Sequence, residues 1–114
     1  MMHMRTFNRL VAGMTVASFM LVTPVVLAQS VAEAKASVEE KPDDSSCHYD
    51  LGMAYYKNSQ YAEAITSFQA AIKLKANYKE AYYDMGMAQQ KTGKNSAAIK
   101  SFQKTIELDK KYAE

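Results

Sequence analysis

Cysteine and histidine are scarce in this chain of 114 residues, and their scarcity excludes two kinds of site. Cys47 is the only cysteine, so no internal disulfide can form. His48 has no second histidine, cysteine pair or suitably spaced glutamate near it, so a zinc ion has no ligand set. The sequence predicts no metal site and no cofactor. Cys47 is interpreted as a small packed residue, with an intermolecular disulfide or a redox-sensitive thiol as the alternative.

A surplus of charge of one sign is also missing. The chain carries 14 basic and 12 acidic residues. Removal of residues 1–28 would take away Arg5 and Arg9 and leave twelve lysines against twelve acidic residues. These charges are interleaved along the chain and form no single-sign patch of the kind that nucleic acids attract. Nucleic-acid binding is therefore not expected.

A repeat of 34 residues is the strongest pattern in the sequence. Residues 45–78 align with residues 79–112 without a gap, and 14 of the 34 positions are identical. The identical pairs include Tyr49/Tyr83, Asp50/Asp84, Gly52/Gly86, Ala64/Ala98, Phe68/Phe102 and Tyr78/Tyr112. A period of this length indicates a unit that cannot bury its apolar face alone and stacks on its neighbour.

Each unit is predicted to be a helical hairpin. Apolar residues recur at helical spacing in two stretches of the first unit, residues 49–56 and residues 64–72. Polar segments separate the stretches, residues 58–60 in the first unit and 92–95 in the second, where Gly93 can adopt the left-handed conformation that closes a helix. The predicted fold is all-α, with two tandem helix-turn-helix units stacked as a short solenoid.

These units resemble the tetratricopeptide repeat, which is also 34 residues long. Repeat positions are numbered from Ser45 in the first unit and from Lys79 in the second. The family's Leu-Gly pair at positions 7 and 8 falls on Leu51-Gly52 and Met85-Gly86. Its aromatic at 11 falls on Tyr55, its Ala at 20 on Ala64 and Ala98, its Phe at 24 on Phe68 and Phe102, and its Ala at 27 on Ala71. The resemblance covers residues 45–112. It implies a first unit at 45–78, a second at 79–112, and the start of an incomplete third at 113–114.

The resemblance also assigns packing roles. Gly52 and Gly86 are expected to let the two helices of a hairpin approach closely, with Ala64 and Ala98 opposite them, and a larger residue in place of either glycine would overpack the contact. Departures from the family pattern predict weaker packing and weaker helix termination, more so in the second unit: His48 and Tyr82 at position 4, Gln89 at 11, Thr105 at 27, and Ala76 and Lys110 at 32.

Residues 1–28 are predicted to be an export signal. Arg5 and Arg9 precede an uncharged stretch from Leu10 to Ala28, which Pro24 interrupts, and residues 26–28 place small side chains where a signal peptidase reads. Cleavage after Ala28 would make the protein a periplasmic or secreted protein of a bacterium. The alternative is a membrane protein, anchored in the inner membrane by residues 10–28.

Residues 29–44 are predicted to be a polar linker. The segment is rich in Ala, Glu and Lys, with Val31 and Val38 as its apolar residues, so it is expected to have no face to bury even where it is partly helical. Asp43, Asp44 and Ser45 are expected to cap the first repeat helix.

No catalytic group is predicted, and the protein is not expected to be an enzyme. Asp50 and Asp84 occupy equivalent repeat positions, which would place two carboxylates on neighbouring helices as in some glycosidases. The repeat alone accounts for this pair, and no other catalytic side chain accompanies it.

The resemblance implies binding of an extended peptide along a concave groove formed by the first helix of each unit. The corresponding residues form an aromatic and methionine stripe edged by lysine, which suits protein recognition. The packing alternative is that tyrosine and methionine partly cover the core. One subgroup of the family clamps a terminal carboxylate with Lys and Asn, and this clamp is absent because Tyr49, Met53 and Asp84 stand there. The predicted groove residues are Tyr49, Met53, Tyr56, Lys57, Tyr83, Met87, Gln90 and Lys91.

Residues 108–114 read like the junction into a third unit, yet no capping helix follows. A solenoid of two units has a small core, and the apolar side of the last helix is expected to lack a cover. This predicts an assembly face at Ile99, Phe102 and Ile106. Two functions stay open: an exported adaptor that binds a peptide of a partner protein, or an element that assembles with itself or another repeat protein, including the case of a fragment of a longer repeat protein.

Overall fold

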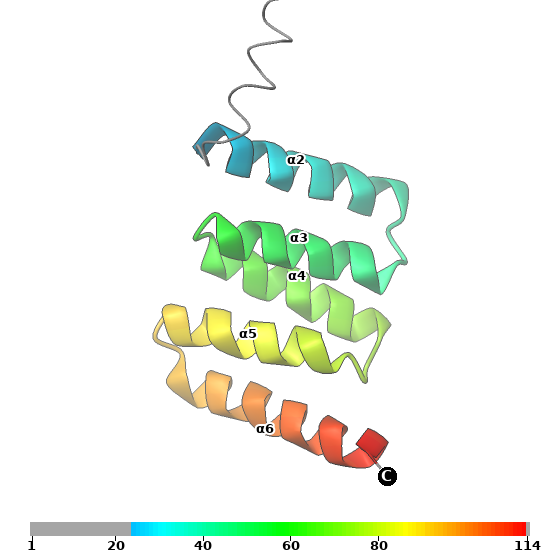
Figure 1. Cartoon of the computed structure of the whole chain (residues 1–114), viewed down its shortest axis with the longest axis vertical. Coiled ribbons are helices and arrows are strands. Elements are labelled where there is room, and N and C mark those ends of the chain that lie inside the picture. The colour runs from blue at the N-terminus through cyan, green and yellow to red at the C-terminus, as the bar shows by residue number, and fades with distance from the viewer. Residues whose placement is uncertain (1–23, 114) are drawn as a thin grey trace, which may run out of the picture.

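The computed structural model describes residues 24–113 of the chain, and its side chains are described for residues 30–111. Five helices and no strand occur within the described residues. They are α2 (Pro24–Glu40), α3 (Ser45–Lys57), α4 (Tyr61–Leu74), α5 (Lys79–Lys91) and α6 (Asn95–Ala113). Each helix packs against the next in chain order, α3 also contacts α5, and the helix pairs are stacked along the long axis of the molecule (Figure 1). The predicted all-α solenoid is confirmed.

Helix α2 corrects the prediction of a linker at residues 29–44. Its residues form a continuous helix that packs on α3, with Val31 only 7% exposed. The stripe that faces α3 is narrow, because Val31 and Val38 are seven positions apart with the small Ala34 between them. Pro24 is its first residue, where proline suits a helix. The fold of two repeats therefore carries a fifth helix on its N-terminal side.

Most of the expected export signal, residues 1–23, lies outside the described part of the chain. The expected cleavage position after Ala28 lies inside α2, and cleavage stays a prediction. Among the described helices, none combines the length and the apolar character needed to cross a bilayer.

The turn between α2 and α3 is fixed by polar contacts. Asp44 is the N-cap of α3, as predicted, and accepts hydrogen bonds from the backbone N–H of Ser46 at 2.9 Å and its hydroxyl at 2.6 Å. These bonds lower the pKa of the Asp44 carboxyl. The His48 Nε2–H donates to the carbonyl of Pro42 at 2.8 Å. His48 thus joins the helix to the turn and has a structural role.

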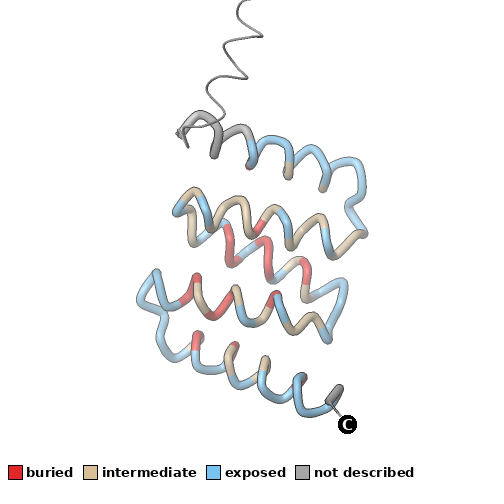
Figure 2. Tube along the Cα trace, viewed as in Figure 1, coloured by how far each residue is buried: buried red, intermediate tan, exposed pale blue. Residues whose placement is uncertain are grey.

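The core lies between α3, α4 and α5, where the buried positions concentrate in Figure 2. Phe68 is completely buried, and Ile65, Met85 and Ala88 surround it in the same cluster. A methyl group added at Gly52 would lie 2.5 Å from Phe68 Cε1, so this glycine lets α3 and α4 approach, as predicted.

The second hairpin repeats this contact with a looser fit. A methyl group at Gly86 would lie 2.7 Å from Phe102 Cε1, but Phe102 is only partly buried. Gln89, which replaces the family's aromatic residue, is 7% exposed and accepts a 2.7 Å hydrogen bond from the hydroxyl of Ser101, itself 4% exposed. The departure at Gln89 is therefore accommodated by a satisfied polar pair.

The turns inside the two hairpins share one backbone conformation. Gly93 has φ 78°, as predicted, and the equivalent residue of the first unit, Ser59, has φ 61°. Ser59 adopts a left-handed conformation that is unfavourable for a residue with a Cβ.

We expect Gly52→Ala to destabilise the protein more than Gly86→Ala. Phe68 is fully enclosed and cannot move away from a new methyl group, so the cost at Gly52 should approach about 3 kcal/mol, whereas Phe102 can shift and the cost at Gly86 should be about 1 kcal/mol. Urea unfolding measures both, with Gln90→Ala on the exposed side of α5 as control. Equal losses in the two glycine variants would contradict this account.

Candidate protein-interaction site

Tyr49, a predicted groove residue, lies at the junction of the two repeats. Its ring centroid is 5.1 Å from that of Tyr78 and 5.7 Å from that of Phe68. Its hydroxyl donates a 2.5 Å hydrogen bond to Asp84 on α5. Burial, and next the hydrogen bond to Asp84, raise the pKa of Tyr49 well above its ordinary value of 10. Tyr49 therefore joins α3 to α5 and is not free to contact a partner with its polar end.

Met53 and Tyr56 also serve packing more than recognition. Both are partly buried against the core, and the Tyr56 ring meets Tyr61 edge-on at 5.2 Å. The other predicted groove residues are more accessible. Tyr83 is 50% exposed, Met87 is partly exposed, and Lys57, Gln90 and Lys91 are exposed. The more accessible part of the predicted groove is thus its second half and its lysine edge, and peptide binding along it stays a prediction.

Helices α5 and α6 line an open hollow of about 500 Å³, here called the C-terminal hollow. It brings together two groove residues and two assembly-face residues that the sequence treated as separate sites. The other two lining residues, Thr105 and Asp109, were assigned to neither site from the sequence. Their positions one and two helical turns after Phe102 could have indicated that they lie on the same face. The lining residues are Tyr83, Met87, Phe102, Thr105, Ile106 and Asp109.

The C-terminal hollow is mainly apolar, with one carboxylate. Asp109 forms an ion pair with Lys79 at 2.7 Å, and the hydrogen bond and charge of Asp109 raise the pKa of Lys79. Both side chains are solvent-exposed, so this pair adds little stability. A ligand of this hollow would therefore be held mostly by apolar contact with Tyr83, Met87 and Ile106.

Exposure differs sharply between equivalent residues of the two units. Ile65 on α4 is 5% exposed because α5 covers it, whereas Ile99 on α6 is 56% exposed. Ile106 is 55% exposed, and its equivalent Ile72 is partly buried. The predicted assembly face is therefore accessible at both isoleucines, while Phe102 points inward to Gly86 and also lines the hollow.

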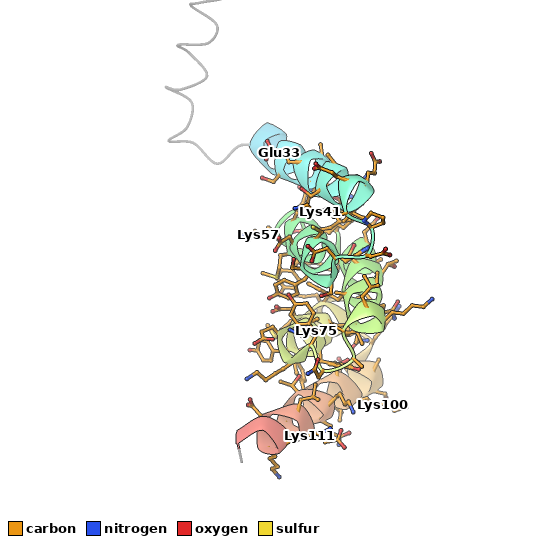
Figure 3. All side chains as sticks on the ribbon, turned by 90° about the vertical axis from the view of Figure 1, so that its right-hand side faces the viewer. Glu33, Lys41, Lys57, Lys75, Lys100 and Lys111 are labelled. Carbon is orange, nitrogen blue, oxygen red and sulfur yellow. The ribbon has the colours of Figure 1, made fainter. Side chains whose placement is uncertain are left out.

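A second hollow, here called the N-terminal hollow, lies between α2 and α3 and has a volume of about 370 Å³. Glu33 and Lys57, both labelled in Figure 3, bring opposite charges to it. Sequence reasoning missed this site because α2 was predicted as a linker. Its lining residues are Ser30, Glu33, Ala34, Ser37, Asp50, Met53, Ala54 and Lys57.

Comparison with protein families supports the repeat assignment directly. Residues 52–93 match a family described as TPR repeat, and residues 79–112 match one described as Tetratricopeptide repeat. The chain belongs to the tetratricopeptide repeat family. The resemblance read from Gly52, Ala64 and Phe68 is thereby confirmed. A comparison with curated proteins gives no match.

Several solved structures share this fold. MamA AMB-1 is 25% identical with TM-score 0.70, over 74% of this chain and 46% of that one. MamA 41-end from Desulfovibrio magneticus RS-1 is 24% identical with TM-score 0.72, over 75% of this chain and 48% of that one. The chain thus spans about half the length of these MamA structures.

A further similar structure is the second TPR of Spaghetti (RPAP3) bound to the HSP90 peptide SRMEEVD. It is 23% identical with TM-score 0.69, over 72% of this chain and 76% of that chain. Tetratricopeptide repeats are protein-interaction modules, and this is the coarse function that the family assigns to the chain. Within residues 24–113, no three His, Cys, Asp or Glu side chains are grouped so that they could hold a metal ion.

We expect Tyr49→Phe to lower the free energy of unfolding by about 1 kcal/mol at pH 7, since the hydrogen bond to Asp84 is lost. Because the pKa of Tyr49 is higher in the folded than in the unfolded protein, the stabilisation of the folded state by its protonated hydroxyl is complete below pH 10. This stabilisation is progressively lost as the pH rises above 10. The difference between parent and variant should therefore narrow in alkali.

Urea unfolding at pH 7 and pH 11 measures this difference. Tyr83→Phe is the matched control, because Tyr83 holds the equivalent position in the second unit and is half exposed. Its effect should stay within about 0.5 kcal/mol. A difference between parent and Tyr49→Phe that stayed constant from pH 7 to pH 11 would contradict the role given to this hydroxyl.

Proposed function

We propose that the protein is an exported adaptor that binds a segment of another protein along α5. The observation that supports this proposal most directly is the apolar C-terminal hollow, in which Tyr83 and Met87 are accessible beside Ile106. Half-exposed tyrosine gives rigid contact area, and methionine adapts to irregular shapes. Gln90 and Lys91 lie exposed farther along α5 and offer polar contacts to the segment.

The kind of segment follows from the lining. An apolar stretch of the partner would contact Tyr83 and Met87, and an acidic residue next to it would meet Lys91. The HSP90 peptide bound to the similar RPAP3 structure supports peptide binding by this fold. This chain has Tyr49 and Met53 where the carboxylate-clamping subgroup has Lys and Asn, so an internal apolar segment suits it better than a terminal carboxylate.

The test is capture of envelope proteins by the full-length chain, followed by titration of the captured segment as a labelled peptide. Tyr83→Ala/Met87→Ala should weaken binding of the peptide by about tenfold or more, because these residues supply the central apolar contact. Gln103→Ala, on the exposed side of α6, is the control and should bind as the parent does. Equal affinity of all three proteins would refute binding along α5.

A second candidate function is assembly through α6. The exposure of Ile99 and Ile106 favours it, because the equivalent face of α4 is buried under α5. Under this candidate, another copy or another repeat protein covers these side chains. Ile106→Asp should then abolish self-association in sedimentation, whereas the equally charged control Gln103→Glu should not. Association that persists in Ile106→Asp would exclude this face.

A further inference from the structure

The contact between α4 and α5 shows which kind of helix covers a face such as that of α6. On α4 the covered side chains are Ile65 and Phe68, which are 5% and 0% exposed. On α5, Met85 and Ala88 belong to the same buried cluster, and Ala81 is also less than a tenth exposed. The hydrogen bond from Tyr49 to Asp84 holds the two units in register.

Helix α6 presents the same face 34 residues later. Ile99, Phe102 and Ile106 correspond to Ile65, Phe68 and Ile72, and Tyr83 corresponds to Tyr49. Within the described residues no helix covers this face, and Ile99, Ile106 and Tyr83 are each at least half exposed. By the repeat, the face fits a helix with small and apolar residues at the positions of Ala81, Met85 and Ala88.

Helix α3 is such a helix. Its Cys47, Leu51 and Ala54 lie 34 residues before Ala81, Met85 and Ala88. Asp50 corresponds to Asp84, the acceptor of the register bond, and it is exposed. The chain therefore contains both halves of the α4–α5 contact a second time: the receiving face on α6 and the covering helix α3.

Helix α2 covers α3 incompletely. Cys47, Leu51 and Ala54 remain partly exposed under it, whereas their equivalents on α5 are buried. Ala34 stands on α2 where α4 has Phe68, and the N-terminal hollow lies beside it. Of the α2 side chains described, Val31 alone is buried. This cover is weaker than the one that α4 provides for α5.

We propose that α3 of a second copy docks on α6 in place of α2, so that copies stack head to tail and α2 is a displaceable cover that limits the stacking. The proposal rests on the assembly candidate and names its partner, a second copy, and its regulation. In the stacked state, Tyr83 donates a hydrogen bond to Asp50 of the second copy, as Tyr49 does to Asp84. Because the two surfaces differ, the contact is heterologous and produces open rows or rings.

Stacking also extends the surface along α5. The helix that arrives next to α5 is α3 of the second copy, which brings its Met53 and Lys57 beside Tyr83 and Met87. Tetratricopeptide arrays need about three units for stability, and two stacked copies supply four. Because docking covers Tyr83, Phe102 and Ile106, which also line the C-terminal hollow, a docked copy and a peptide in this hollow compete for the same surface.

The test is sedimentation of the full-length chain over a range of concentrations. Val31→Asp weakens the cover, and it should lower the concentration at which association is half complete by about tenfold. Val31→Ala should act in the same direction with a smaller effect, which guards against misfolding of the charged variant. Ala32→Asp, an exposed change of equal charge on α2, should behave as the parent does. Ile106→Asp added to Val31→Asp should restore the monomer.

Alkylation of Cys47 by iodoacetamide identifies the surface that is covered. In Val31→Asp, the rate should fall as protein concentration rises, because docking on α6 buries the α3 face that carries Cys47. With Ile106→Asp also present, the rate should not depend on concentration.

Association of Val31→Asp without protection of Cys47 would overturn the head-to-tail contact and leave assembly through α6 standing. Absence of association in the parent and in both Val31 variants would overturn the head-to-tail contact and assembly through α6 together. Association of the parent unchanged by Val31→Asp and Val31→Ala would overturn the role of α2 as a cover.

Discussion

Phe68 is the side chain on which the packing of the described helices depends. Its ring fills the space that Gly52 leaves between α3 and α4, lies beside Tyr49, and belongs to the cluster with Met85 and Ala88 of α5. Three helices thus meet at one fully buried ring. Because packing on both sides of this ring is tight, the first hairpin and the first helix of the second hairpin form one unit.

The two outer helices differ from this centre in a way that follows from the repeat. Helix α6 has the residues of a covered helix but stands uncovered among the described residues, so Ile99 and Ile106 remain exposed. Helix α2 has the place of a covering helix but small side chains, so the N-terminal hollow remains beside it. The proposed interaction surfaces are therefore the exposed face of α6 and the incompletely covered face of α3. At each of them, the tightly packed contact seen at Phe68 is incomplete.

Much of the fold follows from the sequence because the residues that make each contact in the first unit occur again at equivalent positions in the second. The pairs Gly52/Gly86 and Phe68/Phe102 indicate the hairpins, and Gly93 indicates the turn. Helix α2 was missed because its apolar stripe is too narrow to identify without knowing that α3 has an open side. Pro42 was the available signal, since it lies at the repeat position where the family has proline before a new unit begins.

The candidate site was harder to predict than the fold. Tyr49 and Tyr83 are equivalent in sequence, yet Tyr49 is engaged by Tyr78 and Asp84 while Tyr83 is half exposed. Only the neighbours in space separate a packing tyrosine from an accessible one. The same holds for Phe102, which contacts Gly86 and lines the C-terminal hollow at once.

Amide hydrogen exchange across the helices tests the central claim most directly. If the contact at Phe68 supports the array and α2 is a weak cover, amides of α4 and α5 should exchange slowest and those of α2 fastest among the described helices. Exchange in α2 as slow as in α4 would show that α2 is an integral part of the core and would contradict the account.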